Sequence, residues 1–240
     1  MKTMKIVGAF ALILSFALMS CEKVPGLSEE EISEGLKEAL RVGTDTAVTK
    51  LNKSDGFFAD QAIKILLPEE AQPIYNVVST VPLLNTLIDQ TILTINRSAE
   101  DAVVEAKPIF VDAITSITMD DALAILQGED TAATSYLKLK TQQQLHDAFK
   151  PKVEASLKKE IIFGISAENS YEKLINTYNS ASLGGLLFDR IEENSLSEHT
   201  TNKALKGMFV KVGDEETNIR TDVSHRVNET LETVFAELDK

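Results

Sequence analysis

Apolar residues recur at spacings of three and four along most of the chain, which is the pattern of amphipathic helices. A shorter apolar segment, 57–67, ends at Pro68, and no alternation of strand period exceeds about four residues. The pattern predicts an all-α fold, a single irregular bundle of roughly eight to ten helices over residues 28–240. The predicted helices cover 28–51, 82–107, 109–117, 122–127, 131–140, 141–157, 167–179, 197–219 and 224–238.

Local signals predict where these helices begin and end. In a capping box, each of two side chains accepts the backbone N–H of the other residue. Three pairs have the required spacing: Ser28 with Glu31, Thr118 with Asp121, and Thr141 with Gln144. Asp130 is expected to cap the helix at 131–140, and Pro108 is expected to end or kink the helix that starts at Pro82. Pro151 predicts another kink, and Gly184-Gly185 interrupts the pattern over 180–189.

The first 20 residues have a different pattern. Lys2 and Lys5 precede an uncharged run, 6–19, which is shorter than the roughly 20 residues of a spanning helix and is typical of a secretory signal peptide. The run ends in Leu18-Met19-Ser20-Cys21, which resembles the lipobox of bacterial lipoproteins. We therefore expect removal of 1–20, acylation of the Cys21 thiol, and a lipidated tether over 21–27. The alternative is an ordinary signal peptide followed by an incidental cysteine.

The charge of the chain limits its partners. The sequence has 24 basic and 37 acidic residues, and removal of Lys2 and Lys5 leaves 22 and 37, a net charge of −15. Such a surface repels nucleic acid and anionic lipid headgroups, so we expect no nucleic-acid partner. Contact with membrane lipid should come from the acylated Cys21. The predicted location is the bacterial cell envelope, on the periplasmic face of the inner or outer membrane or on the cell surface.

No motif in the sequence predicts catalysis. His146, His199 and His225 lack the spacing of a zinc site, and Cys21 is the only cysteine. The sequence contains no phosphate-binding loop and no serine nucleophile elbow. The acidic pairs at 120–121 and 129–130 lie at predicted helix starts, where negative charge is favourable. We therefore interpret them as structural and not as acid–base catalysts. We expect no cofactor and no enzyme activity. An active site built from titratable residues on separate helices would leave no local motif.

One polar set and one apolar run are candidates for a site. Arg97 and Lys107 lie about 80° apart on a regular helix. With Asp112 and Tyr136 they could form a shared polar face, a solvated face, or an ion pair that holds two helices, and we favour a structural role. Tyr136, like two other tyrosines, could line a pocket or lie half-buried in the core.

The apolar run Leu183–Phe188 contains Leu186, Leu187 and Phe188 directly after two glycines. If it is exposed, the run is a contact for a partner or a membrane. If it is buried, it is a plug over the helical core. We favour the buried plug.

Several short blocks, taken in order, point to a family. The blocks are Gly35-Leu36-Lys37-Glu38-Ala39-Leu40 with Gly43, Asn96-Arg97, Ala106-Lys107-Pro108-Ile109-Phe110, Asp121-Ala122 with Ile125-Leu126 and Gly128, Ala132-Ala133-Thr134 with Tyr136-Leu137, Phe149-Lys150-Pro151, Ala204-Leu205-Lys206-Gly207-Met208-Phe209, and Ile219-Arg220. Together they resemble the bacterial lipoprotein family of domain of unknown function 4197. The resemblance implies an all-helical lipoprotein and carries no assigned activity.

Three functional hypotheses follow. The first is a membrane-anchored, non-enzymatic envelope lipoprotein that binds or scaffolds an envelope protein. The second is a helical domain that binds a small molecule or lipid in a cavity between helices. The third, an enzyme, requires a cluster of titratable residues that only the fold can assemble.

Overall fold

Helices make up most of the computed structural model, in which the described residues are 28–74, 82–162, 164–192 and 195–236. Within these ranges eight α-helices confirm the all-α prediction. They are α1 (Glu29–Leu51), α3 (Pro82–Ala102), α4 (Ala106–Thr115), α5 (Met119–Leu126), α6 (Ala132–Leu157), α7 (Ala167–Ala181), α8 (Leu196–Thr221) and α9 (Glu229–Phe235). The 3-10 helices are η1 (Glu69–Ala71), η2 (Val103–Glu105) and η3 (Val223–His225). The predicted signal peptide 1–20, Cys21 and the tether 21–27 lie outside the described residues.

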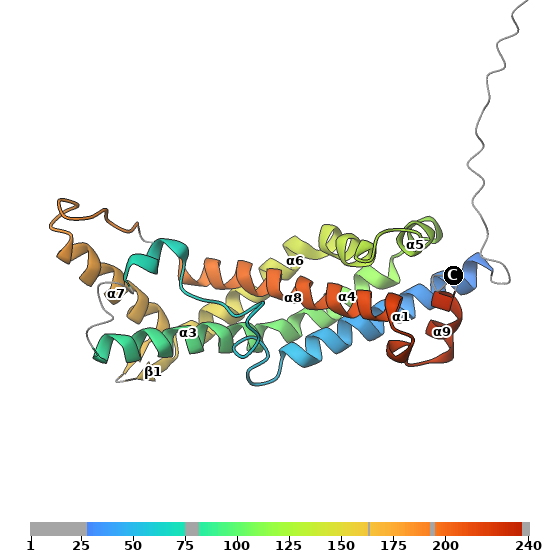
Figure 1. The fold of residues 1–240 in the computed structure, drawn as a ribbon, viewed down its shortest axis with the longest axis horizontal. Coiled ribbons are helices and arrows are strands. Elements are labelled where there is room, and N and C mark those ends of the chain that lie inside the picture. The colour runs from blue at the N-terminus through green and yellow to red at the C-terminus, as the bar shows by residue number, and fades with distance from the viewer. Residues whose placement is uncertain (1–27, 75–81, 163, 193–194, 237–240) are drawn as a thin grey trace, which may run out of the picture.

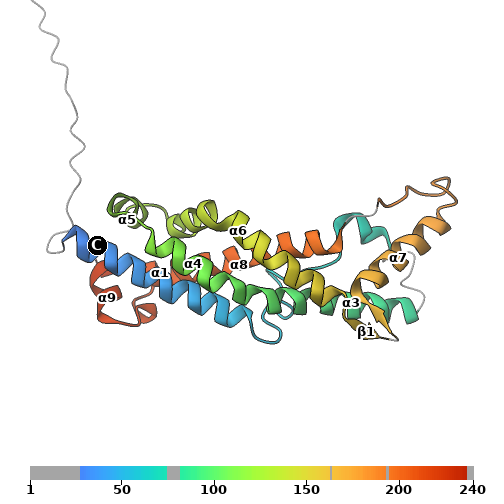
Figure 2. The same ribbon diagram turned by 180° about the vertical axis from the view of Figure 1, so that it is seen from behind.

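The helices form an elongated body with α8 along its middle (Figure 1). α8 packs against α6 and α1, and α3 packs against α6 and α7. The start of α1 lies with α5 and α9 at one end of the body, whereas α7 lies at the opposite end (Figures 1 and 2). Beside α7, the short strands β1 (Glu160–Ile162) and β2 (Ile165–Ser166) form an antiparallel hairpin, which the apolar pattern did not predict.

The core is continuous along this body because each helix buries one apolar face. At its centre, the ring of Phe110 on α4 meets the edge of Phe209 on α8, with the centroids 6.1 Å apart. At one end, Gly35 lets α9 approach α1 closely, since a Cβ at this position would overlap the side chain of Val234. Burial of apolar surface is therefore the main stabilising contribution along the whole length of the molecule.

Two of the predicted capping boxes are confirmed. Thr118 and Asp121 bond reciprocally at the start of α5, and Ser28 and Glu31 do so at the start of α1. The Glu31 carboxylate accepts the backbone N–H of Ser28 at 2.8 Å, and this bond lowers the pKa of Glu31. Local sequence is sufficient at these two helix starts because both partners lie within four residues.

The third predicted box, at Thr141 and Gln144, is wrong. α6 is one helix from 132 to 157, and the Thr141 hydroxyl donates to the Leu137 carbonyl at 2.7 Å in the middle of it. Buried Thr141 thus satisfies its hydroxyl within the helix and does not end it. Pro151 also lies inside α6 and does not divide it.

The start of α6 is not capped by Asp130 either. The N-cap residue is Thr131, and no side chain of the preceding loop caps the helix there. Instead, Glu216 on α8 accepts the backbone N–H of Ala133 at 2.9 Å and that of Thr134 at 2.8 Å. The cap comes from a residue more than 80 positions away, which is why the local signal failed.

Other predicted boundaries shift. The long helix from Pro82 ends at η2, three residues before Pro108, and Pro108 lies in the first turn of α4, where its missing N–H costs nothing. The short apolar segment 57–67 forms turns and irregular backbone. The last predicted helix, 224–238, is shorter among the described residues, where α9 covers 229–235.

Candidate functional site

The four residues of the predicted polar cluster do not form one site. Lys107 pairs with Asp45 on α1, and Asp112 is exposed on α4. Tyr136 is partly buried, and its hydroxyl donates to the Asp121 carboxylate at 3.3 Å. Burial makes the largest contribution to the raised pKa of Tyr136, and the charge of Asp121 adds to it. Each residue thus makes its own contact within the helical framework.

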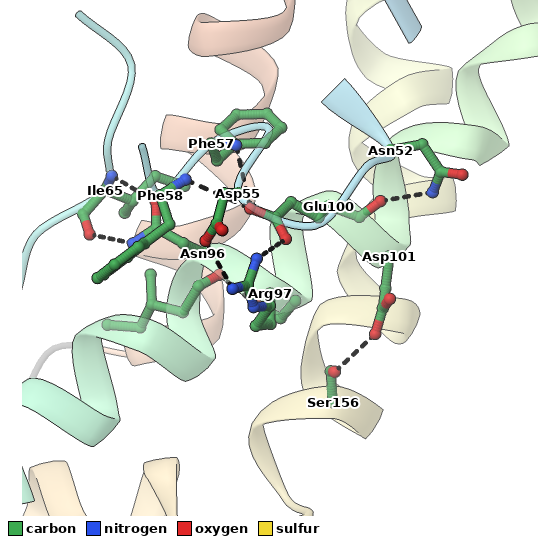
Figure 3. A network of polar contacts seen from close by, with 12 residues as sticks. Asn52, Asp55, Phe57, Phe58, Ile65, Asn96, Arg97, Glu100, Asp101 and Ser156 are labelled. Atoms are coloured by element: carbon green, nitrogen blue, oxygen red, sulfur yellow. Dashed lines mark hydrogen bonds and ion pairs between the residues drawn. The ribbon is translucent and has the colours of Figure 1, made fainter. Parts of the chain in front are cut away.

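Arg97 belongs to a different arrangement, which fixes residues 52–67, here named the core loop (Figure 3). Its guanidinium donates to Glu100 on the same helix and to Asp55 of the core loop, both at 2.6 Å. These bonds raise the pKa of Arg97, Glu100 contributing most. The Arg97–Asp55 ion pair therefore joins α3 to the core loop and not to a second helix, and Lys107 takes no part in it.

Glu100 is the centre of this arrangement, and sequence analysis missed it. Its buried carboxylate accepts the backbone N–H of Phe57 at 3.1 Å and of Phe58 at 3.3 Å (Figure 3). One turn earlier, Asn96 accepts the N–H of Ile65 at 2.9 Å and donates to the carbonyl of the same residue at 2.7 Å. Since all these polar atoms are paired with protein, the arrangement holds the fold and offers no vacant group to a ligand.

A second buried polar group joins three helices. The Glu216 carboxylate accepts a hydrogen bond from Nε of Arg220 at 3.0 Å, in addition to its bonds to the start of α6. The same Arg220 donates to the carbonyls of Leu126 at 3.1 Å and Ile125 at 2.7 Å, which end α5. A carboxylate at a helix N-terminus and a guanidinium at a helix C-terminus both match the helix dipole. This pair is therefore structural as well.

The histidines also lie in separate contacts. His146 Nε2 lies 3.0 Å from the Glu198 carboxylate, which also accepts a hydrogen bond from Lys150 at 2.9 Å. These bonds lower the pKa of Glu198 to about 2, and the bond from Lys150 contributes most. His199 bonds the Leu66 carbonyl, and His225 pairs with Asp222. Over the described ranges, no three His, Cys, Asp or Glu side chains gather to hold a metal ion.

The structure has a small apolar cavity between helices. An apolar cavity between α1, α6, α8 and α9 is lined by Leu40, Gly43, Val212 and Phe235, and it holds about 20 Å3. That is room for about one water molecule, whereas ligand pockets have several hundred Å3. This cavity does not accommodate a lipid chain.

The apolar run 183–188 lies in a loop whose backbone is held at several points. We name residues 182–191 the tip loop. At its base, the Asn179 side chain donates to the Ile191 carbonyl at 2.9 Å and accepts the N–H of the same residue at 2.8 Å. Inside the loop, the carbonyl of buried Ser182 accepts from Gly185 at 3.2 Å and from Leu187 at 3.1 Å. The loop thus has a defined shape before any partner binds.

This shape turns its leucines outwards. Leu186 is 81% exposed, and Leu183 and Leu187 are each 64% exposed. The predicted plug is therefore wrong for Leu186 and Leu187. Only Phe188 is partly buried, with its ring 4.6 Å from that of Tyr178 on α7. Among the residues that the structure describes, these leucines are left largely uncovered.

The backbone of the tip loop is strained where the leucines project. Leu183 has φ of 51°, a left-handed conformation that non-glycine residues rarely adopt. Gly184 and Gly185 follow with φ of 76° and 94°. A strained backbone that exposes apolar side chains reduces stability in two ways, and such strain concentrates at functional sites. The tip loop is therefore the candidate site for contact with another molecule.

The tip loop also has a distinctive position. It projects from α7 at the end of the body opposite to the start of α1 (Figures 1 and 2). Among the helices of the described ranges, none is long and apolar enough to cross a membrane.

A family model described as "Protein of unknown function (DUF4197)" matches residues 26–236. This match covers every described helix, and it confirms the family resemblance that the sequence blocks carry. No curated protein and no solved structure matches the chain.

Proposed function

The chain belongs to the DUF4197 family of proteins of unknown function, and from this premise we propose that it is a non-enzymatic adaptor of the bacterial envelope. In this proposal acylated Cys21 attaches the chain to a membrane, and the tip loop docks into an apolar pocket of a partner protein. The observation that carries the proposal is the exposure of Leu183, Leu186 and Leu187 on a pre-shaped, strained loop.

The position of the tip loop favours a protein over the anchoring membrane as its partner. Residues 21–27 reach at most about 25 Å when extended. α8 alone is about 39 Å long, and the tip loop lies at the end of the body remote from α1. The net charge of −15 after loss of Lys2 and Lys5 also opposes flat binding on anionic lipid. An upright body would present the leucines well away from the bilayer.

The size of the leucine tip fits a small docking contact. Burial of one exposed leucine side chain contributes about 1.5–3 kcal/mol, and three adjacent leucines can act as the central anchors of an interface. Because the tip loop is already ordered by Asn179 and Ser182, little conformational entropy is lost on docking.

The test is site-specific photocrosslinking in the host, with the photoreactive residue at position 187 and, in a second strain, at position 139. Leu139 on α6 is 82% exposed, so it matches Leu186 in exposure but lies outside the tip loop. We expect one discrete protein adduct from position 187 and none from 139. Purified partner should then bind L186S/L187S at least about tenfold more weakly than the wild type, and L139S equally well.

Three outcomes would overturn the proposal. An adduct of twice the mass of the chain would indicate self-association, and adducts to lipid would indicate membrane insertion of the tip. Equal losses in L186S/L187S and L139S would indicate non-specific adhesion. The anchor is tested separately, by incorporation of labelled fatty acid, which should disappear in the Cys21→Ser variant while the tip still binds purified partner.

The structure gives no comparable support to the second hypothesis, a small molecule or lipid bound in a cavity between helices. The cavity between α1, α6, α8 and α9 has only about 20 Å3.

A further inference from the structure

A groove on the side of the molecule lies between residues 62–72 and α8, and no residue of the tip loop lines it. It holds about 240 Å3, about twelve times the volume of the cavity in the core. Polar and apolar residues both line it. A volume of this size has room for a small organic molecule, at about 30 Å3 for each water-sized group.

Positive charge is concentrated in this groove. Lys64 comes from one wall, and Lys203 and Lys206 come from α8, while Glu69 is the one carboxylate in the lining. These four side chains give a net charge of +2, in a chain whose net charge is −13. In the part of the chain that the structure describes, neither Lys203 nor Lys206 lies within ion-pair distance of an acid, and the ammonium of Lys64 lies 3.9 Å from the centre of the Phe58 ring. Lys203 and Lys206 are thus cationic groups that the described fold does not pair, whereas Lys64 contacts the Phe58 ring.

The walls of the groove are fixed without a ligand. His199 Nε2 bonds the Leu66 carbonyl at 2.9 Å, and the Asn96 side chain bonds both backbone groups of Ile65. Gly207 lets the two walls meet, since a Cβ there would lie 2.9 Å from the Phe57 ring and 3.1 Å from Ile63. A site whose walls are already ordered binds with a smaller entropic cost.

Two apolar side chains complete the lining. Leu66 is 48% exposed and Val210 is 40% exposed, on opposite walls of the groove. They would contact carbon atoms next to a charged group. Lysine binds phosphate as a point charge, and a phosphate monoester carries about −1.5 to −2 at neutral pH, which matches the net charge of the lining.

We infer that this groove binds a small phosphate monoester, with Lys64, Lys203 and Lys206 around the phosphate and with Leu66 and Val210 beside its carbon skeleton. The monoester can be a free metabolite or the headgroup of a phosphatidic acid, because both present the same dianion. This site is independent of docking by the tip loop, so either proposal can fail alone.

The test uses the mature protein in nanodiscs of phosphatidylcholine, titrated calorimetrically with glycerol 3-phosphate at low ionic strength. We expect saturable binding, none with glycerol, and at least tenfold weaker binding in K203Q/K206Q. The matched control is K158Q/K159Q, which removes two exposed, unpaired lysines at the end of α6 and should change the affinity less than about twofold.

Further arms distinguish the source of the phosphate. If the headgroup is the ligand, phosphatidic acid in the disc should lower the apparent affinity for glycerol 3-phosphate more than phosphatidylglycerol of equal surface charge; if a free metabolite is the ligand, the two lipids should act alike. Added salt should weaken binding in the wild type, which tests the charge contribution without any mutation. Absence of binding at about 10 mM glycerol 3-phosphate, or equal loss in the two double variants, would overturn the inference.

Discussion

The core loop (52–67) and the tip loop (182–191) are held by the same device but have opposite apolar faces. In each, an asparagine of a neighbouring helix bonds both backbone groups of one isoleucine: Asn96 bonds Ile65, and Asn179 bonds Ile191. The core loop buries Phe57, Ile63, Ile65 and Leu67 and leaves Leu66 exposed, whereas the tip loop exposes three leucines. The comparison teaches that the backbone of a loop can be fixed without burial of its side chains.

The difference has a functional meaning because the two loops contribute differently to stability. Ile65 and Phe57 lie in the hydrophobic core, so the shape of the core loop is explained by the apolar surface that it covers. Each loop has a non-glycine residue with positive φ, Asp55 in the core loop and Leu183 in the tip loop, but the leucines of the tip loop stay exposed and cover little of the fold. A costly shape that does not stabilise the fold is expected where the shape serves binding.

The largest effect of a single substitution that should separate the loops is that of Glu100→Ala. The change leaves one buried and one partly buried N–H group of the core loop without an acceptor and removes the buried partner of Arg97, so we expect a loss of about 3 kcal/mol in the free energy of unfolding. The measurement is the urea midpoint. The control Asp89→Ala, exposed on the same helix, should cost less than about 0.5 kcal/mol. Similar losses in both would mean that the Glu100 contacts contribute no net stability.

The two asparagines that hold the loops, Asn96 and Asn179, can be compared directly. Asn96→Ala should cost about 2 kcal/mol, because its hydrogen bonds are buried, and Asn179→Ala about 1 kcal/mol, because its surroundings are partly exposed. Hydrogen exchange should show local opening of 183–191 in Asn179→Ala and global opening in Asn96→Ala. If Asn179→Ala proved the more damaging change, the tip loop would be a structural element and our comparison would be wrong.

Sequence predicted the parts of this structure that depend on near neighbours. Helical periodicity gave the fold class, and the capping boxes of α1 and α5 lie within single turns. The start of α6 was mispredicted because its cap, Glu216, comes from α8. Glu100 was missed for the same reason, since its partners are backbone groups more than 40 residues away.

The tip loop was mispredicted for a different reason. A run of leucines next to phenylalanine is more often buried than exposed, so apolar composition favoured the plug. Whether such a run is covered depends on where the neighbouring helices end, and here α7 projects beyond the body of the bundle (Figure 1). The groove with Lys203 and Lys206 was not predicted either, because Lys64 reaches it from a segment distant in sequence.

A smaller effect should connect pH to the core loop alone. Burial lowers the pKa of His199 below 6.5, and its Nε2 bond to the Leu66 carbonyl only partly opposes this shift. Since the unfolded chain binds this proton more readily, the contribution of His199 to stability is complete above about pH 6.5 and is lost as the pH falls below that value. His199→Gln should flatten the fall in urea midpoint between about pH 6.5 and 5, whereas the control His225→Gln should not. An unchanged slope in His199→Gln would exclude this titration.

The smallest effect on stability should come from replacement of two exposed leucines in the tip loop. L186S/L187S removes two exposed leucines, so the free energy of unfolding should stay within about 0.5 kcal/mol of the wild type. The matched pair in the core loop, I65S/L67S, replaces two residues that are each 2% exposed and should lose more than about 4 kcal/mol. Both pairs are measured by urea unfolding and by binding to the purified partner. If L186S/L187S keeps its midpoint and loses binding, the tip leucines act in binding and not in folding, whereas a destabilised L186S/L187S would show that they pack against the protein itself.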